Sequence, residues 1–254
     1  MPKSPVVVVV MAVHGRDELT LATVKRLQRQ SLRPFKVIVI GDLSYDVARE
    51  LDGFISYKNK PLGEKWQMGV DIARLFDPDA ICILGSDDWL TDEYLATSMA
   101  LIRDGCDVAC CKVFYMYEIE EMAGHRPLYR WGGYSPKLDH DRVDEPIGAG
   151  RVFSGSVLRR LGWRLFDDNI DNSLDHDCYK RLRSVKARIE FMDDSCCVMG
   201  IGFHGYEYKH RLNKETIDAV FSYPMVNLCD ERIAKSFLAQ QFPGAMDLVL
   251  GVPA

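Results

Sequence analysis

The chain has 254 residues, of which 47% are hydrophobic and 27% charged, and its formal net charge is -5. This composition is that of a folded globular protein, because a disordered chain has too little apolar surface to offset the entropy lost on folding. The 32 basic and 37 acidic residues nearly balance, so there is no bulk attraction to nucleic acid or to an anionic membrane. We therefore expect one folded domain over residues 1–254 that does not bind nucleic acid.

Neither the apolar runs nor the cysteines indicate a membrane or secreted protein. No apolar run reaches the roughly 18 residues that a membrane-spanning helix needs. The eight cysteines form no C-x-x-C pair and have no zinc-ligand spacing. We expect free thiols in the core of a cytoplasmic protein, without a transmembrane segment.

Apolar runs alternate with amphipathic stretches over the first hundred residues. Continuous apolar runs predict buried strands, whereas apolar residues at helical spacing predict helices. The expected strands cover 6–13, 35–40, 54–57 and 80–84, and the expected helices cover 17–30, 45–51, 63–76 and 91–103, the last with Thr91 as its N-cap. This alternation predicts a mostly parallel sheet that is covered by helices on both faces.

The pattern changes after residue 107. Strands are expected over 108–117 and 187–199, a strand leading into a short helix over 151–160, and helices over 175–185 and 231–241. The stretch 124–146 is rich in Gly, Pro, aromatic and charged residues without a clear period, which predicts a functional loop or lid. Its Tyr129, Trp131 and Tyr134 are candidates either for apolar platforms against a ligand or for packing beneath the loop.

Polar residues follow three of the predicted parallel strands. His14 and Arg16 come after the first strand, Asp42 after the second, and Ser-Asp-Asp over 86–88 after the fourth. Ligands of such sheets bind beyond the carboxyl ends of the strands, so we expect one site for a charged, hydroxylated ligand. The two adjacent carboxylates suit Mg²⁺ or Mn²⁺, although either aspartate is also a candidate cap for the following helix.

The order of these motifs resembles that of the GT-A glycosyltransferases, specifically the large inverting family 2. The resemblance covers about residues 5–100 well and about 148–205 more weakly, and it is carried by His-Gly-Arg over 14–16, Gly-Asp-Leu-Ser over 41–44, the segment 59–69, Ser-Asp-Asp-Trp over 86–89 and Gly-Ala-Gly-Arg over 148–151. It implies a Rossmann-like three-layer α/β/α sandwich with a central, mostly parallel mixed sheet. Residues 1–105 would form the nucleotide-binding half, and residues 106–254 the acceptor-binding half with a C-terminal helix.

The resemblance also implies roles for residues of the first half. Asp42 would contact the nucleotide base, while Ala12, His14 and Arg16 would belong to the first nucleotide-binding loop. Lys65 would lie near the nucleotide, and its alternative is a solvated helix residue.

Ser86, Asp87 and Asp88 match the family's D-x-D element, with Ser in place of the first Asp. By resemblance, Ser86 and Asp87 belong to the donor site, where Asp87 would touch the ribose or the sugar. Asp88 would hold Mn²⁺ or Mg²⁺, which would bridge the two donor phosphates and neutralise charge on the departing diphosphate.

The second half carries the candidate base. Leu-Asp-His-Asp over 174–177 resembles the family's Glu-Asp motif at a helix start, with Leu174 in place of Glu. By resemblance, Asp175 would be the general base that takes the acceptor proton, with Asp177 as the alternative. A helix-capping Asp175 is the other alternative. His204 would be a further metal ligand, and His210 is its alternative.

Taken together, the resemblance implies a metal-dependent, inverting glycosyltransferase of the hexosyltransferase type. The donor would be a nucleotide-diphosphate sugar, with a UDP-sugar favoured, and the acceptor a glycan, a lipid-linked sugar or a protein. Two alternatives are a sugar-phosphate nucleotidyltransferase and a catalytically inactive domain that binds sugar nucleotides. The Gly-x-Gly-x-x-Gly run over 200–205 matches a dinucleotide fingerprint, but a polar stretch follows it instead of a packed helix, so NAD is not expected.

Overall fold

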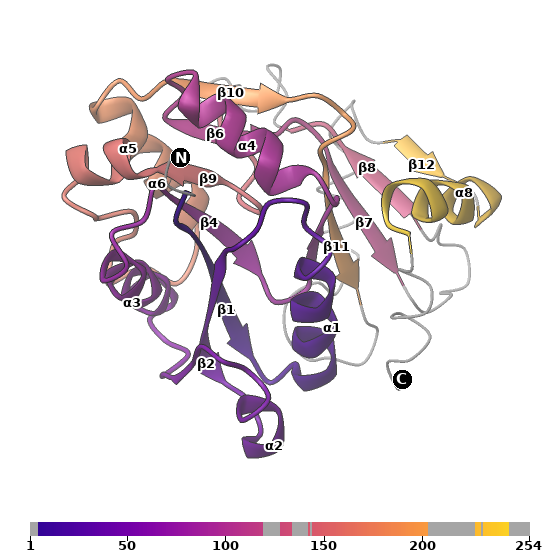
Figure 1. Ribbon diagram of the computed structural model, residues 1–254, viewed down its shortest axis with the longest axis horizontal. Helices are drawn as coiled ribbons and strands as arrows, with labels where there is room; N and C mark the ends of the chain where they lie inside the picture. Colours follow the sequence, from indigo (N-terminus) through magenta and orange to yellow (C-terminus); the bar gives the residue numbers. More distant parts are fainter. Residues whose placement is uncertain are drawn as a thin grey trace.

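The structure is a computed structural model that describes residues 5–118, 128–133, 142, 144–202, 227–229 and 231–243. Two sheets run through the described residues, one of seven strands and one of five. Helices cover both faces of the larger sheet, which gives the three-layer α/β/α arrangement (Figure 1). Within the same residues, no helix is long and apolar enough to cross a membrane.

The larger sheet confirms the expected mostly parallel sheet. Its strands are β1 (Val7–His14), β2 (Lys36–Asp42), β3 (Phe54–Ser56), β4 (Ala80–Gly85), β6 (Val108–Cys111), β9 (Val152–Ser154) and β10 (Ile189–Met192). They lie in the order β10-β6-β9-β4-β1-β2-β3. Only β9 runs antiparallel to its two neighbours, β4 and β6. The four strands β1–β4 therefore present their carboxyl ends along one edge.

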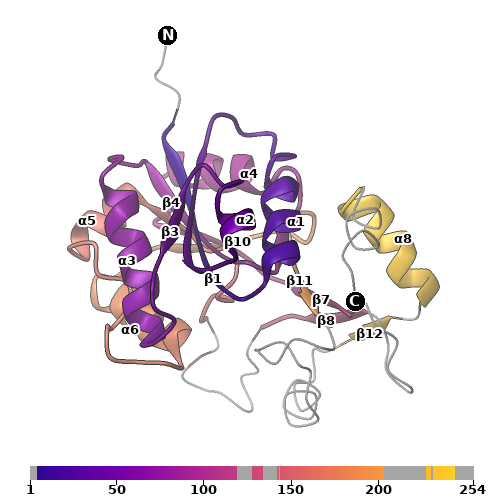
Figure 2. The ribbon, with the colours of Figure 1, turned by 90° about the horizontal axis from the view of Figure 1, so that it is seen from below.

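Helices bury both faces of this sheet. They are α1 (Asp17–Leu27) and α4 (Tyr94–Arg103) on one face and α3 (Leu62–Arg74), α5 (Gly155–Arg160) and α6 (Leu174–Ser184) on the other. The short α2 (Tyr45–Ala48) has no buried residue, and α8 (Glu231–Gln241) packs against the smaller sheet. Successive residues of a strand point to opposite faces. Accordingly, Val9 and Met11 of β1 pack in a core with α1 and α4, whereas Val8 and Val10 pack in a second core with α3, α5 and α6. Figure 2 shows α3 and α6 on the face opposite α1.

The smaller sheet was not expected from the sequence. It contains β5 (Asp88–Leu90), β7 (Phe114–Glu118), β8 (Leu128–Trp131), β11 (Val198–Gly202) and β12 (Asn227–Cys229), in the order β12-β8-β7-β11-β5. A third core joins this sheet to α1 and α8, with Trp89 and Tyr115 from the sheet and Leu238 and Phe242 from the C-terminal segment. The terminal helix was expected over 231–241 and is found there.

Two long predicted strands, 108–117 and 187–199, are wrong because each divides between the two sheets. β6 and β10 lie in the larger sheet, whereas β7 and β11 lie in the smaller one. Between β10 and β11 the chain turns at Asp193, whose carboxylate accepts hydrogen bonds from the backbone and the hydroxyl of Ser195. An aspartate that binds the backbone two residues ahead favours a turn, which hydrophobic periodicity does not reveal.

Two further predictions about local structure need correction. Part of the expected lid over 124–146 is the strand β8, and its Trp131 packs against the core. The side chain of Tyr129 and all of Tyr134 lie outside the described residues. Thr91 is not an N-cap, because residues 88–90 pair with β11 as a strand and α4 begins only at Tyr94, after Glu93.

Candidate active site

The carboxyl ends of β1 and β2 bring His14 and Asp42 together. These residues are opposite each other in the parallel register, and the His14 Nδ1 lies 2.6 and 2.8 Å from the two Asp42 carboxylate oxygens. The side chains are 32% and 54% exposed. Ala12 lies two residues earlier in β1, between β2 and β4. The pair is therefore a solvent-facing carboxylate that an imidazole holds in place.

Arg16 links the loop after β1 to the Ser-Asp-Asp turn. Its Nη1 lies 2.6 Å from Asp87 Oδ2, and both side chains are almost fully buried. Ser86 is held from the other side, because the Thr23 hydroxyl donates to its carbonyl at 2.8 Å and accepts from Trp89 Nε1 at 3.1 Å. Nothing in the sequence marks Thr23, since a threonine inside a helix carries no signal of such a contact.

Asp88 is a buried carboxylate beside this ion pair. Its Oδ2 accepts a hydrogen bond from the Gly85 N–H at 3.0 Å. Burial, and secondarily the neighbouring Asp87 charge, raise the pKa of Asp88 well above its usual range. The cap alternative for Asp87 and Asp88 is wrong, because Asp88 starts β5 and α4 begins six residues later.

The oxygen donors at this position fit a divalent cation. A buried carboxylate with a second one beside it favours a bound positive charge, and Mg²⁺ commonly uses one or two carboxylates together with substrate phosphates. Within the described part of the chain, no group of three or more His, Cys, Asp or Glu side chains could hold a metal by itself. His204 and His210 lie outside the described residues.

Asp175 lies in the first turn of α6 and faces the same region. Arg151 Nη2 donates to Asp175 Oδ1, and the Asp175 side chain is 46% exposed. Arg151 in turn pairs with β4, because its carbonyl accepts a hydrogen bond from the Ile83 N–H at 2.9 Å, and β4 ends at Gly85, whose N–H binds Asp88. The cap alternative for Asp175 is wrong, because Ser173 occupies the N-cap position of α6. Asp177 instead pairs with Arg181, at 2.9 Å.

Lys65 is buried beneath this rim. Its Nζ donates to the Val13 carbonyl at 2.7 Å and to Asn59 Oδ1 at 2.8 Å, and the residue is 1% exposed. The alternative of a solvated helix residue is therefore wrong. Lys65 ties the end of β1 to the segment before α3, and its contact with a nucleotide stays a prediction.

A buried glutamate beside α6 was missed by sequence analysis. The Glu145 side chain is fully buried and accepts from His176 Nδ1 at 2.8 Å and from Arg142 Nε at 2.7 Å. It falls in the stretch expected to be an irregular lid, where no periodicity indicates burial. Glu145 thus anchors the end of that stretch to the helix that carries Asp175.

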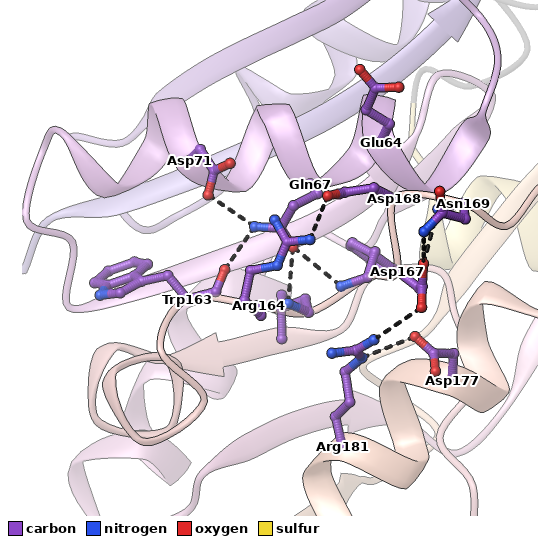
Figure 3. Close-up of polar contacts among 12 residues, drawn as sticks. Glu64, Gln67, Asp71, Trp163, Arg164, Asp167, Asp168, Asn169, Asp177 and Arg181 are labelled. Atoms are coloured by element: carbon purple, nitrogen blue, oxygen red, sulfur yellow. Dashed lines mark hydrogen bonds and ion pairs between the residues drawn. The ribbon is translucent and has the colours of Figure 1, made fainter.

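Gln67 is a second buried connection that sequence analysis did not assign. Its amide nitrogen donates to Asp71 at 2.9 Å and to the Trp163 carbonyl at 2.7 Å, while its oxygen accepts from the backbone N–H groups of Leu165 and Phe166 at 3.0 and 3.2 Å. Figure 3 shows this amide pointing from α3 into the loop that precedes α6.

The same loop continues toward α6. Asp167 lies 3.8 Å from Arg181 Nη2, and Arg181 also binds Asp177, as Figure 3 shows. At the start of α3, the Gly63 N–H donates to the Ile170 carbonyl at 2.8 Å. Residues 163–171 therefore connect α3, which carries Lys65, to α6.

Comparisons with known proteins identify the family and the fold of the chain. The family model "Glycosyl transferase family 2" matches residues 8–162, which is more than half of the chain. A structure of S. aureus TarS 1-349 aligns over 77% of this chain with a TM-score of 0.54 and 14% sequence identity, and the structure of that fragment in complex with UDP gives the same values. A longer S. aureus TarS structure aligns over 96% of this chain with a TM-score of 0.51 and 14% identity.

The chain matches only part of the length of the TarS structures. The chain spans 60% of the length of the TarS fragment and 42% of the longer TarS structure. At 14% identity, the likeness to TarS shows a shared fold. No curated protein matches the chain in sequence.

Proposed function

The chain belongs to glycosyl transferase family 2 and has the GT-A fold, and from this premise we propose that it moves a sugar from a nucleotide-diphosphate sugar to an acceptor hydroxyl. The observation that carries the proposal is that two sets of aspartates lie at the same edge of the larger sheet. Asp42 and the pair Asp87–Asp88 lie at the donor side, and Asp175 is bound by Arg151, whose backbone pairs with β4, the strand that leads into Asp87 and Asp88. A donor-binding acid set and a separate base are what such a transfer needs.

The donor side has a group for each part of a nucleotide-diphosphate sugar. Asp42, held by His14, is an acceptor for N–H groups of a base, and Asp87 is an acceptor for ribose or sugar hydroxyls. Arg16 and Lys65 place positive charge beneath the rim. A UDP-sugar is favoured because a TarS structure with the same fold was solved in complex with UDP. Ala12 and Ser86 belong to this site through their backbone.

Asp88 is the residue proposed to hold Mn²⁺ or Mg²⁺, with His204 as a further ligand and His210 as its alternative. When bound, the ion would neutralise negative charge that builds up on the donor diphosphate. Asp88 is suited to this role because its buried carboxylate lies next to Asp87, where the two negative charges disfavour each other.

Asp175 is proposed as the general base. Its carboxylate would accept the proton of the acceptor hydroxyl while that oxygen forms a bond to the anomeric carbon. The bond from the anomeric carbon to the diphosphate breaks, and its electron pair leaves with the nucleoside diphosphate. A single displacement of this kind inverts the anomeric configuration. Asp177 is less suited because Arg181 holds it at 2.9 Å.

The proposal also covers the domain organisation, the acceptor and the cellular location. Residues 1–254 would act as one domain with a donor half and an acceptor half, and the acceptor would be a glycan, a lipid-linked sugar or a protein. A cytoplasmic location is supported by the seven cysteines other than Cys229, which are buried free thiols and include both vicinal pairs.

A product-release assay tests the proposed reaction. Incubation with UDP-sugars and Mn²⁺ should release UDP, whereas a sugar-phosphate nucleotidyltransferase would release pyrophosphate from a nucleoside triphosphate. Asp175→Asn should lower the release rate by about 10²-fold or more, since a positioned base contributes on this scale. Asp177→Asn is the matched control. If Asp177→Asn were inactive and Asp175→Asn active, the base assignment would move to Asp177; neither product with any donor would favour the inactive domain.

A further inference from the structure

We propose that Arg151 positions the Asp175 carboxylate for proton transfer and that Gly148 supplies the space which this carboxylate occupies. The inference rests on the proposed function, because it concerns the surroundings of the base proposed there. Arg151 acts through Asp175 and is therefore a positioning residue.

Arg151 is a buried residue that contacts both Gly148 and Asp175. The side chain is 1% exposed, its Nε donates to the Gly148 carbonyl at 3.2 Å, and its Nη2 donates to Asp175 Oδ1. Its guanidinium also lies 5.9 Å from the centre of the Phe153 ring. A planar guanidinium fixed on two sides holds a carboxylate in one orientation, which a flexible ammonium group does not.

The charge of Arg151 is retained at this buried position. Burial acts to lower the pKa of Arg151, but the charges of neighbours that include Asp175 and Glu145 outweigh it, so the pKa is raised. The ion pair engages Asp175 Oδ1, and among the described residues no hydrogen bond reaches Oδ2. Arg151 thus anchors one oxygen, and the second oxygen of this half-exposed side chain is the one proposed to take the proton of the acceptor hydroxyl.

Gly148 is needed for space. A Cβ atom at Gly148 would lie 2.3 Å from Asp175 Oδ2 and 2.4 Å from Oδ1, far inside van der Waals contact. The backbone of Gly148 is not in the left-handed region, so alanine would fit the local conformation. Because the clashing atoms are the end of a side chain, Gly148→Ala should move the carboxylate without unfolding the chain. The run Gly-Ala-Gly-Arg over 148–151 therefore supplies both the anchor and the space.

The test measures UDP-sugar hydrolysis and UDP binding by calorimetry in the presence of Mn²⁺. Gly148→Ala and Arg151→Gln should lower kcat by about 10²-fold, the scale of a displaced reacting group, while the Kd for UDP changes by less than about threefold. Arg151→Lys should recover part of the lost kcat, since lysine keeps the charge but not both contacts. Arg188→Gln is the matched control, because Arg188 pairs with Glu190 on the exposed edge strand β10, and it should behave like the wild type.

Thermal melts separate folding from positioning. If Arg151→Gln does not fold, Gly148→Ala decides the matter alone. Wild-type kcat in Gly148→Ala would overturn the inference, as would an equal loss of kcat and of UDP affinity. Asp175→Asn distinguishes a failure of the proposed base from a failure of the positioning role. An active Asp175→Asn contradicts the proposed base. An inactive Asp175→Asn together with an active Gly148→Ala contradicts only the positioning role.

Discussion

Replacing Gln67 by leucine should destabilise the fold by about 3–5 kcal/mol, because the change removes an amide while keeping most of its volume. The variant would leave three backbone groups in the interior without a partner: the Trp163 carbonyl and the N–H groups of Leu165 and Phe166. Each buried group left unsatisfied costs about 1–3 kcal/mol. We expect the lower end of the sum, since water can enter beside the partly exposed Asp71.

Urea denaturation followed by circular dichroism measures this loss as a shift of the midpoint at constant slope. A loss of about 3–5 kcal/mol would consume much of the 5–15 kcal/mol that typically separates folded from unfolded domains. Asp71→Asn is the control, because it alters only the partly exposed partner of Gln67 and should cost less than about 1 kcal/mol. A loss below about 1 kcal/mol for Gln67→Leu would refute the view that this amide holds the loop 163–166 against α3.

Three further outcomes follow from buried groups. Thr23→Val removes the hydroxyl between Ser86 and Trp89 and should cost about 1–3 kcal/mol in urea denaturation; an unchanged midpoint would contradict that contact. Burial and the charge of Asp87 raise the pKa of Asp88, so its ionised form destabilises the fold as pH rises. Asp88→Asn should therefore melt at a higher temperature than the metal-free wild type at neutral pH. In acid, where Asp88 is protonated, the two proteins should melt at similar temperatures. Equal melting temperatures of the two proteins at neutral pH would contradict a destabilising effect of the ionised Asp88. The seven buried cysteines, which exclude Cys229, should react slowly with a thiol reagent until the chain unfolds, and rapid labelling of more than one thiol in the native protein would show that they are accessible.

Much of the fold was predictable because continuous apolar runs mark buried parallel strands. β1, β2 and β4 are such runs, and the polar residues after them necessarily share one edge of the sheet. The smaller sheet escaped prediction because β5 and β12 have three residues each and because β7 and β11 continue, in the sequence, the apolar runs of strands in the larger sheet. Periodicity does not reveal where a run leaves one sheet and enters another.

Some features of the candidate site could likewise be predicted from the sequence, and others could not. The sequence pattern predicts that His14 and Asp42 share one edge of the sheet, and the parallel register of β1 and β2 sets them opposite each other. The contact of Arg151 with Asp175 depends on how β9 and α6 pack, and a one-dimensional pattern contains no such information. Nothing in the sequence marks Gln67, because its hydrogen-bond partners lie far along the chain, in the loop 163–166 that packs beside α3.

The most direct test of the central claim is a calorimetric titration of the protein with UDP, with and without Mn²⁺, in the wild type and in Asp88→Ala. The proposed donor site predicts binding that strengthens with the metal in the wild type and loses this dependence in Asp88→Ala. Arg188→Gln should keep the wild-type dependence, since its ion pair lies away from the site. Equal UDP affinity in the wild type and Asp88→Ala, with the metal present, would contradict the assignment of this edge of the sheet as a metal-dependent donor site.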